Sequence, residues 1–461
     1  MASTAPSRPD QLTRLLVAST MGVYLLIAVG VTTALTDAVS ACPTWPLCGT
    51  GPFAALGDLA LAVTLAHRAV ALVVAGVLVA TLWVAWRRGA TRRVRLALGT
   101  AGALYPVQVG VGALTAVSAA PAWLSALHLV TAMVLFSALL VALLWQLEAD
   151  TPAEGDVADE TAGEPAPAPE PPAGRFPTLR AYLTLTKPKL WWLLALVALA
   201  AMALAAGPAL ELGVAAATIA GGVLAIAASG TFNNVLERDR DRRMARTNDR
   251  PIATERIPAR RAAAFGLALT LASAAVFLAY VNALAAALGM LAILFYSVVY
   301  TLVLKPHTDQ NTVLGGAAGA FPALIGWAAI ENTLGVEAVA LAAVIFLWTP
   351  AHFYNLALVY RQDYERAGFP MLPVVRGAAV TRRHVTLYLG ATMLAAVLLG
   401  TVQGLDWLYA LTAVGVGALF LWAVVRQFAE RTDASATRTF MASNAYLGLL
   451  LVAVLLDTLV V

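Results

Sequence analysis

The chain has 461 residues, of which 60% are hydrophobic and only 12% are charged, and its formal net charge is +4. Soluble domains are roughly 45–50% apolar, so this composition excludes an ordinary soluble protein and indicates a polytopic membrane protein. The arginines fall in short clusters between apolar stretches, as in the cytoplasmic loops of membrane proteins, so the positive charge does not indicate a nucleic-acid partner.

Apolar stretches of about 20 residues, the length needed to cross a bilayer as a helix, recur along the whole chain. The polar first residues lack the short apolar core and cleavage site of a signal peptide, so we expect the first stretch to be a retained span. The stretches predict a four-helix bundle followed by a nine-helix bundle, an all-α polytopic membrane fold. The predicted spans are residues 15–36, 58–86, 96–118, 122–146, 190–208, 212–235, 260–281, 283–304, 311–331, 335–358, 384–403, 406–427 and 440–461.

Residues 148–178 separate the two predicted bundles. They are rich in Glu, Asp, Pro, Ala and Gly, a composition that cannot bury enough apolar surface to fold. We therefore expect a linker between a first domain at residues 1–147 and a second domain at residues 179–461.

Lys and Arg concentrate in every second loop between the predicted spans. Because short cytoplasmic loops carry this excess, the pattern predicts a multi-pass protein of a prokaryotic cell membrane. The N-terminus, the linker and the most charged loops would then face the cytoplasm. The loop that contains Cys42 and Cys48 would lie outside.

The most charged segment begins at Asn233 and holds four acidic side chains and six arginines in nineteen residues. Asn233, Glu237 and Asp241 recur every four residues, so they share one face if the preceding helix continues through them. Oxygen ligands on one face suit Mg²⁺ bound together with phosphate oxygens. The guanidinium groups of Arg246 and Arg250 match phosphate geometry. The alternative is a solvated loop whose charges only set the topology.

A second loop, WTPAHFYNLALVYRQDY, places Asp363 at the same predicted face of the membrane. Two acid-bearing loops at one mouth of a helical bundle are suited to hold a metal-bound diphosphate. Further candidates for substrate contact at this mouth are Lys187, Lys189, Asn234, Lys305, His352, Tyr360 and Arg361. For His352 a purely structural role is the alternative.

In order and spacing, these motifs resemble the UbiA-type intramembrane prenyltransferases. The resemblance covers residues 180–461 and rests on LTLTKPK, NNVLERDRDRRMARTNDRP, GGAAGAFPALIGW and WTPAHFYNLALVYRQDY with PMLPVVRG. The HFYNLALVYRQDY form is similar to the branch of the family that farnesylates heme, whereas quinone-type relatives show an Asp-rich second motif. Glu237 stands where many members have Asp.

The resemblance implies a reaction and its cofactor. Mg²⁺ would be held by Asn233, Glu237, Asp241 and Asp363, and nearby Arg and Lys side chains would neutralise the leaving diphosphate of farnesyl diphosphate. The 2-vinyl group of heme b would accept the farnesyl group, which gives heme O for terminal oxidases. The bundle would open to the lipid bilayer to take the isoprenoid tail.

The first four predicted spans carry two histidines, His67 and His128, each near the outer end of its span. Two imidazoles at one depth in a bundle are suited to be the axial ligands of a heme iron. The alternative is a hydrogen bond from helix to helix. Cys42 and Cys48 lie in the loop on the same face, where they form one disulfide or remain free thiols.

This half resembles one half of heme A synthase through CPTWPLC, the His67–Arg68 pair, QVGVGALTAVS and SALHLVTAMVLF. The resemblance implies bound heme b, a disulfide with a redox role, and pairing with heme A synthase or a second copy of the chain. Members of that family commonly have a glutamate three residues before the first histidine, implicated in oxidising the heme methyl group, and here that position is Thr64. We therefore expect a heme-binding module that does not complete this oxidation alone.

Two other functions fit parts of the sequence. A UbiA-type prenyltransferase that acts on a quinone or lipid acceptor would leave His67 and His128 unexplained. A transporter or heme carrier would not require acidic loops on one side of the membrane, and the sequence shows no detectable inverted repeat.

Overall fold

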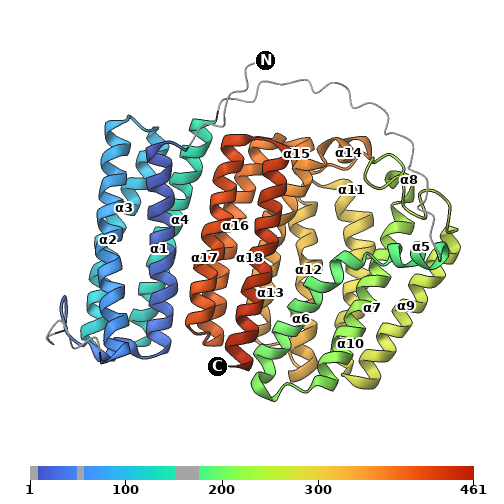
Figure 1. Ribbon diagram of the computed structural model, residues 1–461, viewed down its shortest axis with the longest axis horizontal. Helices are drawn as coiled ribbons and strands as arrows, with labels where there is room; N and C mark the ends of the chain where they lie inside the picture. The colour runs from blue at the N-terminus through green and yellow to red at the C-terminus, as the bar shows by residue number, and fades with distance from the viewer. Residues whose placement is uncertain (1–8, 49–56, 152–175, 461) are drawn as a thin grey trace. The chain divides into compact units, whose positions relative to one another are not determined.

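The computed structural model describes residues 9–48, 57–151 and 176–460, and nearly all of them are helical (Figure 1). Thirteen of the described helices are long and apolar enough to cross a membrane, which confirms the predicted spans and the all-α membrane fold. Most of the predicted linker lies outside the described residues. The spanning helices are α1 (Gln11–Leu35), α2 (Leu59–Arg87), α3 (Arg92–Val117), α4 (Ala122–Asp150), α6 (Trp191–Ala206), α7 (Leu212–Leu236), α9 (Ala259–Tyr280), α10 (Ala283–Leu294) with its continuation to His307, α12 (Asn311–Glu331), α13 (Val336–Val359), α16 (Gly377–Gln403), α17 (Trp407–Glu430) and α18 (Asp433–Leu459).

Several helices begin before the apolar stretch that predicted them, because a polar turn extends them. α1 begins at Gln11 after Asp10, whose carboxylate accepts a hydrogen bond from the Thr13 N–H at 2.6 Å. Such a cap satisfies a backbone donor that the helix cannot satisfy itself. α16 and α18 likewise begin seven residues ahead of the predicted 384 and 440, at 377 and 433.

The described helices form two compact units. The first unit holds α1–α4, α16 from Thr386, α17, and α18 as far as Tyr446. Within it, α1 packs against α2 and α4, and α3 packs mainly against α4. Ser19 on α1 and Thr81 on α2 share a buried hydrogen bond of 2.9 Å, so the polar groups in this core are paired.

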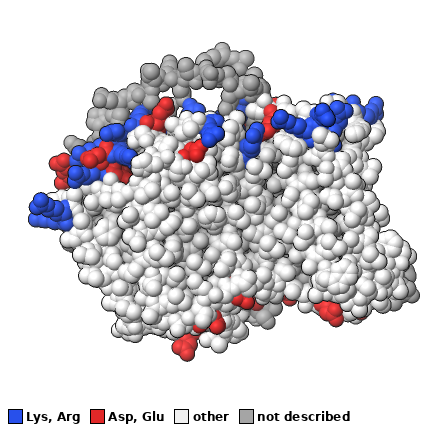
Figure 2. Space-filling model, turned by 180° about the vertical axis from the view of Figure 1, so that it is seen from behind, with Lys and Arg blue, Asp and Glu red and all other residues white. Residues whose placement is uncertain are grey.

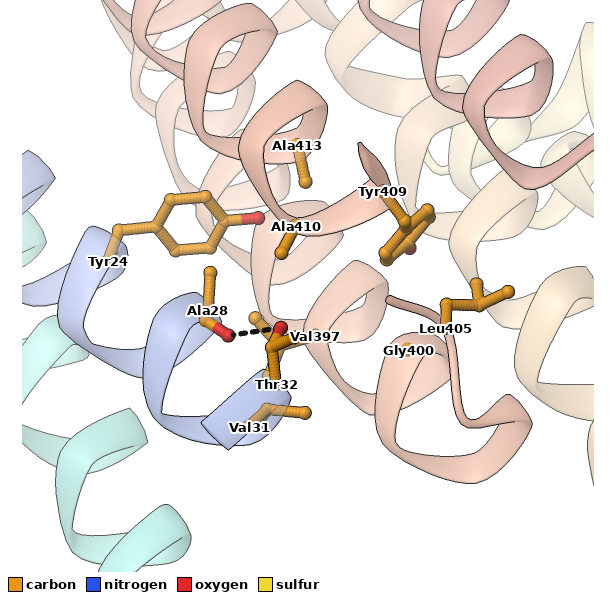
Figure 3. Close-up of a pocket in the computed structure, with 10 residues that line it drawn as sticks. All are labelled: Tyr24, Ala28, Val31, Thr32, Val397, Gly400, Leu405, Tyr409, Ala410 and Ala413. Carbon is orange, nitrogen blue, oxygen red and sulfur yellow. Dashed lines mark hydrogen bonds between the residues drawn. The ribbon is translucent and has the colours of Figure 1, made fainter. Parts of the chain in front are cut away.

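A small cavity lies inside the first unit, between α1 and the α16–α17 pair (Figure 3). Its volume is about 20 Å³, and Tyr24, Thr32, Val397 and Tyr409 are among the side chains that line it. A single water molecule needs about 10–15 Å³ of such space. The cavity is therefore far too small for a porphyrin or an isoprenoid.

The second unit holds α5 (Pro177–Leu185) through α15 (Leu372–Val375), the start of α16 to Val385, and α18 from Leu447. In this unit α7 packs against α6, α9 and α10. The fully buried ring of Phe277 fits between Gly221 and Gly289, where an added Cβ would lie 2.9 Å from the ring. Glycine is therefore required at both positions for the helices to approach this closely.

Two features of the second unit position the site described below. Residues Phe295–Leu304 form a π-helix between α10 and α11 (Lys305–His307), a type of turn that is frequent at functional sites. The short helices α8 (Arg238–Asp241), α11, α14 (Arg361–Arg366) and α15 lie at one end of the unit (Figure 1).

Charge is distributed unevenly along the helices of each unit. On the face shown in Figure 2, Lys and Arg gather at one end of the helices, and the few charged side chains seen at the opposite end are acidic. This distribution is typical of a multi-pass membrane protein. The predicted domain boundaries at 147 and 179 stay a prediction, because packing of the described residues groups most of α16–α18 with the first four helices.

Candidate functional site

Asn233, Glu237 and Asp241 lie on one continuous helical path. α7 ends at Leu236, but the Glu237 N–H donates to the Asn233 carbonyl at 2.9 Å and the Asp241 N–H donates to the Glu237 carbonyl at 2.8 Å. The four-residue register therefore continues through α8. All three residues are at most 3% exposed, so the two carboxylates need compensating charge.

Cationic side chains supply that compensation. Lys305 Nζ donates to both carboxylate oxygens of Glu237, at 2.6 and 2.8 Å. Arg250 Nη1 lies 2.9 and 2.8 Å from the two carboxylate oxygens of Asp241. The segment thus folds back on itself, because residue 250 closes onto residue 241 of the same loop.

The third oxygen donor is the side-chain amide of Asn233, which links three elements of the fold. Lys187 Nζ, just before α6, donates to Asn233 Oδ1 at 2.5 Å and lies 3.4 Å from the Tyr296 hydroxyl. Asn233 Nδ2 donates to Thr301 Oγ1 at 3.0 Å. Tyr296 and Thr301 are five residues apart on the π-helix, whose wider turn brings both toward one face. An apolar stretch does not distinguish this turn from an α-helix, so neither residue is among the predicted site residues.

Burial and neighbouring charges shift the pKa values of this cluster. Burial opposes ionisation of Glu237, but Lys305 and Lys187 hold the pKa of its carboxyl below the ordinary value. At Asp241 burial dominates and raises the pKa, and Arg250 offsets only part of that effect. Burial, together with repulsion from Arg250, lowers the pKa of Lys187 to about 7.

Anion binding should therefore be coupled to protonation of Lys187. At pH 8 the free protein holds this lysine mostly neutral, and a bound phosphate favours its charged form, so binding takes up about one proton at this side chain. We expect calorimetry of pyrophosphate binding in buffers of different ionisation enthalpy to show this uptake as a difference between the wild type and Lys187→Met. Equal proton exchange in the two proteins would contradict the assignment.

Asp363 reaches the same loop from α14. Its Oδ1 accepts from the Ala245 N–H at 2.9 Å, and its Oδ2 accepts from the Arg246 N–H at 3.1 Å. Arg366 Nη1 lies 3.2 Å from Oδ1. These contacts support an anchoring role that joins the two loops, whereas its role as a Mg²⁺ ligand stays a prediction.

Arg246 sits between two tyrosines of the second loop. Its Nη2 donates to the Tyr364 hydroxyl at 2.9 Å, and its guanidinium carbon lies 4.9 Å from the ring centres of both Tyr360 and Tyr364. Its Nε is buried and has no hydrogen-bond partner within the described ranges. A buried donor in this state is expected to meet an acceptor such as a phosphate oxygen.

Four other predicted site residues lie outside this cluster. Lys189 is exposed, and the Asn234 amide donates to the Gly230 carbonyl at 2.7 Å, within α7. His352 is buried in α13, where its ring stacks on Trp348 at 4.3 Å. Arg361 begins α14 and is half-buried. Their roles in substrate binding stay predictions.

The donors fit Mg²⁺ only together with a phosphate ligand. Asn233, Glu237 and Asp241 offer hard oxygen atoms, the type that Mg²⁺ prefers. Among the described residues, no three His, Cys, Asp or Glu side chains are grouped so that they alone would hold a metal ion. Mg²⁺ commonly uses one or two carboxylates, several waters and substrate phosphate oxygens, and this donor set matches that arrangement.

The first unit brings glycines against both predicted heme ligands. A Cβ on Gly30 of α1 would lie 3.3 Å from His67 Cε1, and one on Gly112 of α3 would lie 2.9 Å from His128 Cε1. Both Nδ1 atoms are buried and lack hydrogen-bond partners in the described part of the chain. Gln108, the first residue of the QVGVGALTAVS motif, donates to the His128 carbonyl at 2.9 Å. The two glycines make room for the imidazole rings, and each ring keeps a nitrogen without a partner that could bind a metal, so the role of both histidines as axial heme ligands stays a prediction.

The outer loop is tied to the same helix. Cys42 and Cys48 form a disulfide, and Arg68 donates to the carbonyls of Thr44 and Cys42 at 2.9 and 3.1 Å. The Thr64 hydroxyl lies 2.7 Å from the Ala38 carbonyl. Thr64 offers no carboxylate for heme oxidation, and the redox role of the disulfide stays a prediction.

Comparison with known proteins agrees with both halves. A family model described as UbiA prenyltransferase family matches residues 194–448, and one described as cytochrome oxidase assembly protein matches residues 2–140. Protoheme IX farnesyltransferase of Halobacterium salinarum is 54% identical over 457 residues and covers 98% of each chain. Protoheme IX farnesyltransferase 1 of Natronomonas pharaonis is 56% identical over 459 residues and covers 97% of this chain and 98% of its own.

A solved structure of digeranylgeranylglyceryl phosphate synthase has a TM-score of 0.52 with 16% identity, over 61% of this chain and 99% of that chain, which shows a shared fold. The UbiA prenyltransferase family model thus confirms the resemblance predicted for the second half. The cytochrome oxidase assembly protein model confirms the one predicted for the first half. The chain belongs to the UbiA prenyltransferase family, and over nearly its whole length it is similar to relatives named protoheme IX farnesyltransferase.

Proposed function

We propose that the chain transfers the farnesyl group of farnesyl diphosphate to the 2-vinyl group of heme b, which makes heme O. The observation that carries this proposal is the buried cluster at the end of α7, where Asn233, Glu237 and Asp241 meet three cationic side chains. Relatives that share about half of its residues over nearly its full length carry the corresponding name.

The paired charges suit a diphosphate that arrives with a metal ion. Glu237 and Asp241 carry two negative charges, and Lys305, Arg250 and protonated Lys187 carry three positive charges. When a diphosphate enters, the carboxylates can turn to the metal while the cations turn to phosphate oxygens. The ion pairs therefore keep the site in place before substrate binds and become the binding groups afterwards.

The chain's own residues then act on the leaving group. Lys187, Lys305 and Arg250 would stabilise the negative charge that develops as the bond between the farnesyl carbon and the diphosphate oxygen breaks. Mg²⁺, held by Asn233, Glu237 and Asp241, would neutralise the same charge when bound. The vinyl carbon forms the new C–C bond, and water supplies the hydroxyl group of the product.

The direct test is incubation of the purified protein with heme b, farnesyl diphosphate and Mg²⁺, followed by mass analysis of the extracted heme. We expect heme O. A quinone and a glycerolipid acceptor are offered in parallel reactions. Prenylation of either one with unchanged heme b would support the other branch of the family and overturn the proposed acceptor.

For the first unit we propose a heme-binding site with His67 and His128 as axial ligands. We expect heme b bound to the purified protein to give a low-spin absorption spectrum, and His67→Ala or His128→Ala to remove it. The matched control is His307→Ala, because His307 is exposed on α11 of the second unit. A low-spin spectrum that persists after loss of both His67 and His128 would contradict the assignment.

We also propose the orientation and the partners. The Lys- and Arg-rich loops support a cytoplasmic N-terminus and a cytoplasmic diphosphate site in a prokaryotic cell. The disulfide loop would then lie outside, where disulfides persist. Pairing with heme A synthase or with a second copy of the chain follows from the resemblance of the first half alone.

A further inference from the structure

The second loop approaches the diphosphate cluster with aromatic rings. α14 ends in a Schellman turn, in which the Phe369 N–H donates to the Tyr364 carbonyl at 2.9 Å and the Gly368 N–H donates to the Glu365 carbonyl at 3.0 Å. Gly368 has a φ of +70°, which favours glycine. The turn directs Phe369 back against Tyr364, where the rings meet edge to face at 6.3 Å.

Two cationic side chains, Lys305 of the site and the neighbouring Arg240, contact the Phe369 ring. Lys305 Nζ is 4.3 Å from its ring centre, and the Arg240 guanidinium carbon is 4.7 Å from it. The ring is 1% exposed. Cation–π attraction is stronger at such desolvated positions than at the surface. Lys305 is therefore held from two directions, by the Glu237 carboxylate and by the Phe369 ring.

Tyr360 and Tyr364 hold Arg246 in the same way, with both ring centres 4.9 Å from its guanidinium carbon. The Tyr364 hydroxyl also accepts a hydrogen bond from Arg246 at 2.9 Å. A carboxylate in place of these rings would fix the cation and neutralise it as well. A ring fixes the cation through its quadrupole and leaves the positive charge available to an anion.

We propose that Tyr360, Tyr364 and Phe369 form an aromatic clamp that positions Arg246 and Lys305 for the diphosphate. These three are positioning residues, and the proposal rests on the diphosphate site proposed above. The clamp gives the second loop a function that does not require metal ligands. It orders Arg246 and Lys305 without adding a further carboxylate to the one that already pairs with Lys305.

The test uses Phe369→Leu and Phe369→Tyr in the full-length protein. Leucine keeps an apolar side chain but removes the ring face, so we expect pyrophosphate with Mg²⁺ to bind about tenfold more weakly. Tyrosine restores the ring, so we expect affinity within about threefold of the wild type. Calorimetry measures both affinities without farnesyl transfer. We further expect the KM for farnesyl diphosphate to rise more than kcat falls.

Phe277→Leu is the matched control, because Phe277 is equally buried in the same unit but packs between glycines and not against cations. We expect it to leave pyrophosphate affinity unchanged. Wild-type affinity in Phe369→Leu, equal weakening in Phe277→Leu, or failure of Phe369→Tyr to restore binding would each overturn the clamp. If Phe369→Leu does not fold, Tyr360→Leu takes its place, with the same weakening expected. Failure of the wild type to bind pyrophosphate would instead reject the underlying site.

Discussion

Replacing Asp241 with Asn is expected to lower the rate of farnesyl transfer by about a hundredfold or more, because the change removes a charge that the transition state needs nearby. Asp241 is 1% exposed and lies within 2.9 Å of Arg250 Nη1 through both of its carboxylate oxygens. An amide keeps the size of the side chain but loses the negative charge that pairs with Arg250 and would bind Mg²⁺. The measurement is turnover at saturating Mg²⁺ and farnesyl diphosphate.

Asp239→Asn is the matched control for this substitution. It makes the same chemical change two residues away, but the Asp239 side chain is 65% exposed and meets Arg238 and Arg242 only at 3.5 Å. We expect its turnover to stay within about twofold of the wild type, since surface ion pairs contribute little. Heme b binding should stay unchanged in both variants. Wild-type turnover in Asp241→Asn would remove this residue from the proposed metal site.

The membrane fold could be predicted from the sequence because one physical requirement dominates it. A helix that crosses lipid must be apolar over about 20 residues, and hydropathy alone shows this pattern. The ends of the helices depend on local caps in water, and these are harder to read from hydropathy. α16 begins at Gly377 and α18 at Asp433, well before their apolar stretches, because the more polar residues at their N-terminal ends extend both helices.

The candidate site could be predicted where it depends on local periodicity. The spacing of Asn233, Glu237 and Asp241 indicated a shared face, and the backbone hydrogen bonds follow that spacing. The partner of each side chain depends on how distant helices meet, which periodicity does not encode. The pairing of Lys305 with Glu237, separated by 68 residues, is one example.

The π-helix and the aromatic clamp show a second limit. Phe295–Leu304 is apolar in a way that suits either an α-helix or a π-helix, so the contact of Thr301 with Asn233 could not be foreseen. From the sequence, the second loop is predicted to act through Asp363 as a metal ligand and Tyr360 as a substrate contact, whereas aromatic rings of this loop contact cations of the site. A visible signal did exist, since Gly368 followed by Phe369 after a short helix is typical of a Schellman turn.

Replacing Lys305 with Met is expected to lower the free energy of unfolding by about 3–5 kcal/mol, because it leaves the Glu237 carboxylate buried without its main partner. The two side chains are 9% and 4% exposed, so water cannot replace the lost ammonium group. The measurement is unfolding of the purified protein in detergent, with Lys189→Met as the matched control. Lys189 is exposed before α6, so the same substitution there should change stability by less than about 0.5 kcal/mol.

The pH dependence of this variant separates a lost charge partner from a lost packing contact. In the wild type Lys305 holds the pKa of Glu237 below its ordinary value, so the stability from this pair is present above the unfolded pKa and is lost as pH falls through the folded pKa. In Lys305→Met burial, which raises this pKa, is opposed only by Lys187 and Arg250, so the loss of stability as pH falls should shrink or reverse. Glu237→Leu combined with Lys305→Met removes both charges and should recover most of the lost stability. A double variant no more stable than Lys305→Met would mean that the lysine stabilises the fold by packing, and the ion pair would lose its role in holding the site before substrate binds.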